Sequence, residues 1–308
     1  MKSKLVLVWL AAVAGLFASG CKGGEGPPDQ KSGAPTGEPA KAGPVSLNGA
    51  GATFPYPLYS KWMSEYNRVH PDIQINYQSI GSGGGIRQIQ AKTVDFGASD
   101  APMTAEEDAK SKSKLLHIPT TLGAVAITYN LPEVTGLKLD AAALTGIYLG
   151  TISRWDDAKV KAENAGIKLP ATPIVVVYRS DDSGTTAVFT DYLAKVSPEW
   201  KENAGVGKSV KWPVGLGAKG NEGVTSQVKT SPGGIGYVEL AYAMENKLPM
   251  VALENASRKF VEPGIAAITS AAASVEMPDT LHASITNATG DATYPISAFS
   301  YFLVYEDA

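Results

Sequence analysis

The chain contains few residues of the kinds that build redox, metal or hydrolytic sites. Its 308 residues include one cysteine, Cys21, and three histidines, and no histidine lies in a recognisable motif. One cysteine excludes an internal disulfide, and no HExxH motif or Cys/His cluster provides metal-ligand spacing. The G-x-S-x-G elbow is also missing, so Ser183 has no recognisable base to activate it as a nucleophile. We therefore expect no metal, no cofactor and no enzymatic activity.

Charge of either sign is also scarce. Only 19% of the residues are charged and the formal net charge is −3, which argues against a nucleic-acid partner or a polybasic membrane patch. The hydrophobic content of 44% is ordinary for a folded protein. A chain of this length is too long for one small core, so two globular lobes are expected.

The first 44 residues resemble an export signal and a tether rather than part of a core. Lys2 and Lys4 precede an apolar run, Leu5–Phe17, which is too short to span a bilayer comfortably and ends near Cys21. Small residues before a cysteine are typical of a lipobox, so residues 1–20 predict a signal peptide and Cys21 a lipidation site. An ordinary secretory signal is the alternative. Residues 21–44 are rich in Gly, Pro, Lys and Glu and predict a flexible linker. We expect a periplasmic or cell-surface protein anchored to a membrane by lipid.

From residue 45 onward, strand patterns alternate with helix patterns. The alternation predicts an α/β fold whose sheet is largely parallel and has helices on both faces. Two long apolar segments, Ile118–Tyr129 and Ile296–Tyr305, enclose the middle of this body. They suggest one lobe inserted into another and joined to it by two crossing strands.

Three loops rich in Gly, Ser and Thr each follow a strand pattern and precede a helix pattern. They are Gly49–Thr53, Gly81–Gly85 and Ser183–Thr186. A helix N-terminus presents unpaired N–H groups and a partial positive charge, and glycine lets an anion approach them closely. For a single loop, ordinary turn geometry is the better explanation, but three such loops together favour an anion site. None of the loops carries the complete glycine pattern of a dinucleotide-binding motif or the Gly-Lys-Ser/Thr ending of a P-loop.

Two charged residues narrow the kind of anion. Arg179 ends a strand pattern, and its planar set of donors suits a tetrahedral oxyanion, with Asp181 placed to orient it. A surface Arg-Asp pair is the alternative. Asp100 follows another strand and would repel an anion unless the anion carries a proton that the carboxylate accepts. Hydrogen phosphate carries such a proton and sulfate does not, so Asp100 would select against sulfate. An Asp bonded only to nearby N–H groups of a turn is the alternative.

Long segments of the body resemble the periplasmic phosphate-binding proteins of bacterial ABC transporters, which are type II periplasmic binding proteins. The segments are Gly49–Trp62 (GAGATFPYPLYSKW), Tyr77–Ile89 (YQSIGSGGGIRQI), Val94–Met103 (VDFGASDAPM), Ile147–Asp157 (IYLGTISRWDD), Arg179–Phe189 (RSDDSGTTAVF), Lys211–Val224 (KWPVGLGAKGNEGV) and Gly233–Ala243 (GGIGYVELAYA). The resemblance covers residues 45–245 densely and returns at residues 294–305. It implies two α/β lobes, each a central mixed sheet flanked by helices, joined by two hinge strands and closing on phosphate.

The resemblance also assigns roles to residues. It implies phosphate donors at Thr53, Phe54 (through its backbone N–H), Ser82, Arg179, Ser183, Gly184 and Thr185. Asp100 would accept the phosphate proton, and Asp181 would support Arg179. The family usually has two serines where this chain has Ser82-Gly83, and the first of the two is the contacting position.

The expected organisation places lobe 1 at residues 45–120 plus 295–308 and lobe 2 at residues 121–294. The family normally continues past Tyr305 with helical sequence that completes lobe 1, so we expect that lobe to be incomplete at its C-terminal end, with exposed apolar surface and reduced stability. The expected partners are inorganic phosphate and the transmembrane permease of a phosphate ABC transporter, and the chain is expected to be a monomer. Arsenate binding, a phosphoester hydrolase, and a sensor or adhesin without a permease are the alternatives.

Overall fold

The computed structural model describes residues 43–307. The predicted signal peptide, Cys21 and nearly all of the predicted linker lie outside these residues, so the export signal and the lipid anchor stay predictions. Among the helices of residues 43–307, none is both long enough and apolar enough to cross a bilayer.

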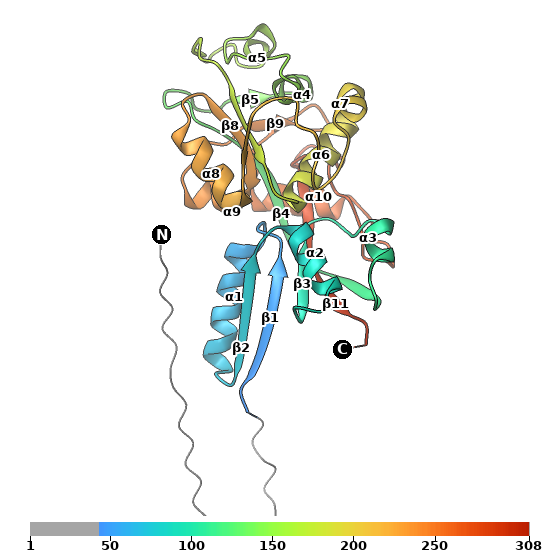
Figure 1. The fold of residues 1–308 in the computed structure, drawn as a ribbon. Helices are drawn as coiled ribbons and strands as arrows, with labels where there is room; N and C mark the ends of the chain where they lie inside the picture. The colour runs from blue at the N-terminus through green and yellow to red at the C-terminus, as the bar shows by residue number, and fades with distance from the viewer. Residues whose placement is uncertain (1–42, 308) are drawn as a thin grey trace, which may run out of the picture. The chain divides into compact units, whose positions relative to one another are not determined.

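Eleven strands and ten helices make up the described part of the chain (Figure 1). The strands are β1 (Val45–Gly51), β2 (Ile73–Ser79), β3 (Phe96–Ser99), β4 (Leu115–Tyr129), β5 (Lys138–Leu139), β6 (Val175–Arg179), β7 (Leu216–Ala218), β8 (Gly234–Glu239), β9 (Ala252–Glu254), β10 (Phe260–Val261) and β11 (Ser297–Tyr305). The helices are α1 (Tyr56–Val69), α2 (Ser82–Gln90), α3 (Ala105–Ala109), α4 (Ala141–Leu149), α5 (Ala158–Ala162), α6 (Gly184–Val196), α7 (Pro198–Asn203), α8 (Gly220–Thr230), α9 (Leu240–Glu245) and α10 (Ile265–Ala273).

Eight of the strands form one sheet in the order β2-β1-β3-β11-β4-β8-β6-β7, and β10, β9 and β5 form a second, smaller sheet. The outer pairs β1·β2, β1·β3, β6·β8 and β6·β7 are parallel, as β-loop-α units require. The central pairs β3·β11, β11·β4 and β4·β8 are antiparallel. The expectation of a largely parallel sheet is therefore wrong for the centre, because β4 and β11 run antiparallel to their neighbours. The sheet is mixed.

The long strands β4 and β11 lie side by side between the two parallel ends of the sheet (Figure 1). Along β4, Leu115–Ala124 pair with β11 and Val125–Tyr129 pair with β8. The ladder between β4 and β11 shifts register at Ser300, where Thr120 is the extra residue on β4. Both strands were expected from their apolar runs, but their pairing was not.

The helices bury their apolar faces against this sheet. The largest core lies around β4, β6 and β8 and includes Trp155, Phe189 and Tyr237. Helix α1 behaves differently, because Leu58, Trp62 and Tyr66, which are four residues apart along it, are exposed. Trp62 and Tyr66 border an apolar cavity of about 450 Å³ that also involves Phe302.

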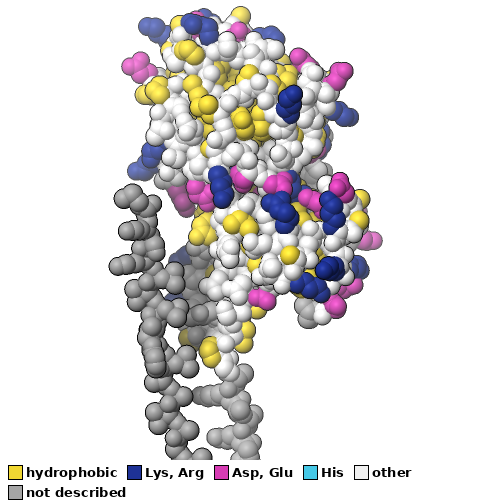
Figure 2. Space-filling model, in the orientation of Figure 1, with side chains coloured by type: hydrophobic (Ala, Val, Ile, Leu, Met, Phe, Trp, Pro, Cys, Tyr) yellow, Lys and Arg dark blue, Asp and Glu magenta, His cyan; other side chains and the backbone are white. Residues whose placement is uncertain are grey.

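Charged side chains of both signs lie next to one another across the middle of the face shown in Figure 2. Two ion pairs connect the α2 and α3 region to the segments around α6. Arg87 on α2 pairs with Asp182 at 2.7 Å, and this pair is largely exposed. Lys208 pairs with Glu107 on α3 at 2.7 Å, and here the lysine side chain is only 7% exposed.

Candidate anion-binding site

The candidate site is formed by four connections that each lead from a strand to a helix: β1 to α1, β2 to α2, β6 to α6 and β7 to α8. The strands β4 and β11 lie between them in the sheet. Ser82 is the first residue after the N-cap of α2, Gly184 holds the same position in α6, and Asn221 is the second residue of α8. Thr53 lies in the loop before α1. Carboxyl ends of parallel strands collect at one edge of a sheet, which brings these polar groups together. The side chains of this group are buried, so the N–H and O–H donors are shielded from water.

Ser82 connects the start of α2 to the start of α6. Its Oγ accepts a hydrogen bond from the Gly184 N–H at 3.1 Å and another from the Asp100 N–H at 3.3 Å. Its O–H lies 3.4 Å from Asp100 Oδ2. Gly184 has no space for a side chain, since an added Cβ would lie 2.5 Å from Asp100 Oδ2. The three predicted residues Ser82, Asp100 and Gly184 are therefore in direct contact.

Arg179 ends β6 and is 3% exposed. Its Nε and Nη2 donate to the two carboxylate oxygens of Asp181 at 2.8 and 2.6 Å, and Nη1 donates to Thr185 Oγ1 at 3.2 Å. Burial lowers the pKa of Arg179, but the bond to Asp181 outweighs it and the net direction is upward. Arg179 and Asp181 therefore form a bidentate, buried pair, so the alternative of a surface pair is wrong.

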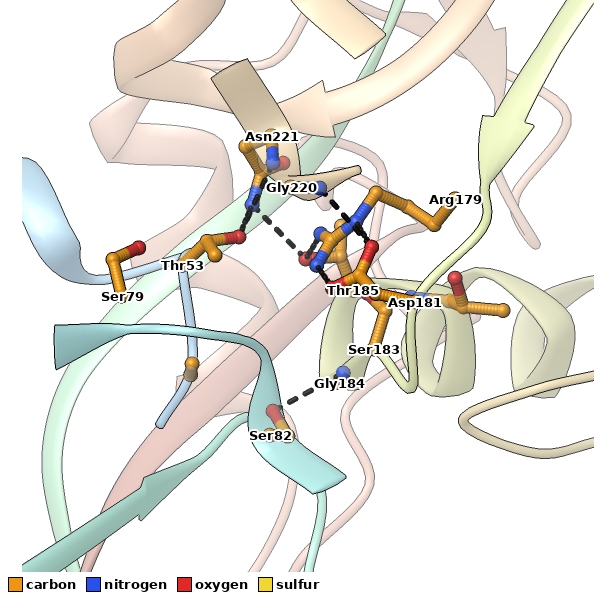
Figure 3. Close-up of polar contacts among 12 residues, drawn as sticks. Thr53, Ser79, Ser82, Arg179, Asp181, Ser183, Gly184, Thr185, Gly220 and Asn221 are labelled. Atoms are coloured by element: carbon orange, nitrogen blue, oxygen red, sulfur yellow. Dashed lines mark hydrogen bonds and ion pairs between the residues drawn. The ribbon is translucent and has the colours of Figure 1, made fainter. Parts of the chain in front are cut away.

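Asn221 links residues of two connections, and we did not single it out from the sequence. Its Nδ2 donates to Thr53 Oγ1 at 2.6 Å and to Thr185 Oγ1 at 3.3 Å (Figure 3). Its Oδ1 accepts from the Glu239 N–H at 2.9 Å. Two local signals were present: Asn221 lies within the segment Lys211–Val224 that resembles the family, and it follows Gly220, which starts α8 with a φ of 72°. Gly220 thus marks a fourth strand-to-helix turn that contains glycine.

Two other predicted residues, Ser183 and Phe54, are also buried at this site but make different contacts. Ser183 is the N-cap of α6, and its Oγ accepts from the Thr186 N–H at 3.1 Å. Accepting that bond leaves its O–H hydrogen available to a ligand. Phe54 follows Thr53, is 2% exposed and packs its ring over Gly123. The Thr53 carbonyl accepts from Tyr242 Oη at 2.7 Å, which fixes the first loop.

Asp100 is the acidic group among these donors, and it is 3% exposed. Ser300 on β11 donates to its Oδ1 at 2.7 Å, a contact that the sequence did not predict. Burial raises the pKa of Asp100 to about 7, although the Ser300 bond, Arg179, Ser82 and Lys208 all act to lower it. The turn alternative is wrong, because both carboxylate oxygens bond to distant residues. Asp100 therefore titrates near neutral pH and can accept a proton once ionised.

A second buried carboxyl group, Glu239, lies behind Asn221. It is the N-cap of α9, where its Oε2 accepts from the Ala241 N–H at 2.7 Å. Burial raises its pKa to about 8, and the negative charge of Asp100 adds to the shift.

Comparison with known proteins identifies the class first. A family model described as "PBP superfamily domain" matches residues 34–308. Two solved structures share the α/β fold at low identity. They are a putative phosphate ABC transporter substrate-binding protein from Clostridium perfringens (TM-score 0.63, 19% identity, 85% of this chain and 87% of that one) and a periplasmic phosphate-binding protein called PfluDING (TM-score 0.68, 24% identity, 85% and 80%).

Curated relatives narrow the class to a family. The phosphate-binding protein PstS of Pasteurella multocida is 47% identical over 267 residues, which are 85% of this chain and 77% of the relative. The PstS of Methanocaldococcus jannaschii is 41% identical over 287 residues, or 87% and 74%. The chain belongs to the family of the phosphate-binding protein PstS.

Proposed function

We propose that this chain binds inorganic phosphate at the group of buried donors and delivers it to a membrane permease of a phosphate ABC transporter. The observation that carries the proposal is Asp100, a carboxyl group placed among donors from the starts of α2 and α6 and from Ser300 on β11. A fully ionised oxyanion would face a like charge there, whereas hydrogen phosphate donates its proton to the carboxylate. Membership of the PstS family supports the same ligand.

Hydrogen bonds rather than net charge would carry the binding. The positive charge of Arg179 is balanced by Asp181, so the site does not attract every anion equally. Thr53, Ser82, Ser183 and Thr185 would add hydroxyl donors, and Phe54 and Gly184 would add backbone N–H donors. Uncharged hydrogen-bond donors held in fixed positions distinguish one anion from another by its shape and by where it carries a proton.

We further propose that the body works as two lobes, with β4 and β11 as the hinge strands. The contacts Ser82–Gly184, Thr53–Asn221 and Arg87–Asp182 would then all cross the cleft. They would form on closure and separate on opening, as in hinge motions of binding proteins. The lobe limits proposed from the sequence, residues 45–120 plus 295–308 and residues 121–294, fit this assignment.

The proposed role is transport and not catalysis. The PstS relatives are binding proteins, and the Ser183 Oγ already accepts the Thr186 N–H as a helix cap. Arsenate carries a proton as phosphate does and is the second candidate ligand. The lipid anchor at Cys21 and the monomeric state are parts of the same proposal.

Calorimetric titration of the chain with phosphate and with sulfate at pH 8 tests the proposal. We expect phosphate to bind at least about 100-fold more tightly than sulfate, equivalent to about 2.7 kcal/mol. Equal affinities would exclude the role of Asp100, and no phosphate binding at all would exclude the function. Titration with arsenate under the same conditions compares the two protonated anions.

A further inference from the structure

Tyr242 is a buried residue that bonds to the first loop of the site but is not in the proposed set of phosphate donors. It lies on α9 and is 6% exposed, and its Oη donates to the Thr53 carbonyl oxygen at 2.7 Å. In the proposed division into lobes, Thr53 belongs to lobe 1 and Tyr242 to lobe 2. This hydrogen bond therefore crosses the cleft, as the bond between Thr53 and Asn221 does.

The Thr53 carbonyl belongs to the same peptide group as the Phe54 N–H, which is one of the proposed phosphate donors. The C=O and the N–H of a trans peptide point in opposite directions in one plane, so a bond that fixes the carbonyl also fixes the direction of the N–H. A donor on the carbonyl also polarises the peptide group and makes its N–H a stronger donor. Phe54 is buried, and its N–H forms no hydrogen bond within residues 43–307. The N–H is therefore available to a ligand.

A second acceptor lies beside the Tyr242 hydroxyl group. Glu222 Oε1, on α8, is 3.1 Å from Oη. A hydroxyl group has one hydrogen, so Tyr242 donates to Thr53 or to Glu222 but not to both at once. Burial raises the pKa of Tyr242 well above its ordinary value, so the hydroxyl group keeps this hydrogen near neutral pH.

Both partners of the bond across the cleft would keep another bond if the lobes separated. Tyr242 and Glu222 lie in the same proposed lobe, so their contact does not depend on closure. The Thr53 carbonyl also accepts from the Tyr56 N–H at 3.3 Å, which is a bond within lobe 1. On closure the hydroxyl group would exchange the carboxylate of Glu222, an exposed residue that water can hydrate, for a buried carbonyl. Neither partner is left unpaired in either state, so the exchange costs little.

We propose that Tyr242 is a positioning residue for phosphate binding: its hydroxyl group moves from Glu222 to the Thr53 carbonyl as the lobes close, and it thereby orients the Phe54 N–H toward the bound anion. The inference rests on the proposed phosphate-binding function. Glu222 competes with Thr53 for the same hydrogen, so it lowers phosphate affinity by stabilising the open state.

Calorimetry with inorganic phosphate on the full chain tests the positioning role. Tyr242→Phe keeps the ring and removes the hydroxyl group. We expect it to weaken phosphate binding by about 3- to 10-fold, because water replaces the exposed bond to Glu222 in the open state but not the buried bond to Thr53. The matched control is Tyr129→Phe, which removes a buried bond from a tyrosine to the Val134 carbonyl at 3.1 Å. It should leave phosphate affinity unchanged.

Glu222→Gln should have the opposite effect. The amide can turn its NH₂ group toward Oη and donate to it, which leaves the hydroxyl hydrogen to Thr53, so we expect phosphate to bind about 2- to 4-fold more tightly. In the Tyr242→Phe background the same change should have no effect, because the hydroxyl group is absent. Glu245→Gln removes an exposed carboxylate from α9 itself and should leave the affinity unchanged.

Hydrogen exchange of the Phe54 amide, followed by NMR on the phosphate-bound chain, measures the positioned donor directly. Tyr242→Phe should speed this exchange by about the factor by which it weakens phosphate binding, because opening exposes the amide to water. Tyr129→Phe should leave the exchange rate unchanged.

Several outcomes would overturn the inference. They are full phosphate affinity or unchanged Phe54 exchange in Tyr242→Phe, an equal loss of affinity in Tyr129→Phe, and no gain of affinity in Glu222→Gln. An equal gain from Glu222→Gln with and without the Tyr242 hydroxyl group would also overturn it, since only the charge of Glu222 would then act. If Tyr242→Phe does not fold, Glu222→Gln decides alone. Failure of the unmodified chain to bind phosphate would instead reject the proposed function.

Discussion

At the scale of single residues, Asn221 makes the most contacts among the site residues that we did not predict from the sequence. Its amide group bonds to Thr53, Thr185 and the backbone of Glu239. Its amino group donates to both hydroxyl oxygens, while its carbonyl oxygen accepts from the Glu239 N–H and fixes the amide, so that the two O–H hydrogens are left to point toward a ligand. Asn221 thus aligns donors from two connections without needing to touch the anion.

We expect Asn221→Ala to weaken phosphate binding by about 5- to 150-fold, equivalent to about 1–3 kcal/mol for buried partners left unpaired. Calorimetry on the purified variant measures this change. Asn203→Ala, at the exposed end of α7, is the matched control and should bind as the unmodified chain does. Unchanged affinity in Asn221→Ala would show that the hydroxyl groups need no alignment.

Only some of the site residues could be predicted from the sequence. Asp100, Arg179 and Ser82 could be predicted, because each lies in a local segment whose chemistry and resemblance are recognisable. Asn221 and Ser300 also lie in segments that resemble the family, but each contacts site residues that are far away in the chain. Their roles depend on which elements pack together, and no local motif carries that information.

At the scale of elements, the close approach of α2 and α6 depends on Gly184. A methyl group there would overlap Ser82 Oγ and lie 2.5 Å from Asp100 Oδ2. Alanine itself is well suited to a helix, so the local structure of α6 would tolerate the change. The contact between the two helix starts would not.

We therefore expect Gly184→Ala to lower phosphate affinity at least about 100-fold, or about 2.7 kcal/mol, while the midpoint of denaturant unfolding changes little. Calorimetry and urea denaturation measure the two effects. Gly166→Ala is the control, because nothing lies within 4 Å of an added Cβ at that position. Full phosphate affinity in Gly184→Ala would mean that the two helix starts separate in the bound state.

The elements themselves were largely predictable, because periodicity is a local property. The apolar segments Ile118–Tyr129 and Ile296–Tyr305 both appear as long strands, β4 and β11. The antiparallel centre of the sheet was not predictable from the alternation of strands and helices. Pairing of β4 with β11 joins segments about 180 residues apart, and only the three-dimensional packing determines it.

At the scale of the whole molecule, two buried carboxyl groups make stability depend on pH. The pKa of Asp100 rises from 3.8 to about 7 and that of Glu239 from 4.5 to about 8 in the folded chain. Between the unfolded and folded values, the folded state binds more protons than the unfolded state. The free energy of unfolding therefore falls as pH rises through this range.

We expect the ligand-free chain to become less stable between pH 6.5 and pH 8.5. This window lies above the titration of His117, whose lowered pKa of about 4 gives the opposite slope at more acidic pH. Urea unfolding at several pH values measures the slope. Asp100→Asn should reduce it, and Asp279→Asn, an exposed position, should leave it unchanged. Stability that rises across the window would contradict the buried state of both carboxyl groups.

The register shift between β4 and β11 determines what the deletion of one residue would do to this segment. Thr120, the extra residue, bonds through Oγ1 to the Ser300 carbonyl at 3.0 Å, and Ser300 in turn holds Asp100. Loss of Thr120 would leave Pro119 and Thr121 adjacent and paired with Tyr301 and Ser300, so the bulge would disappear together with the hydroxyl group that bonds to Ser300. Surface loops tolerate small insertions and deletions at little cost, whereas loss of one residue here would remove a contact to the residue that holds Asp100.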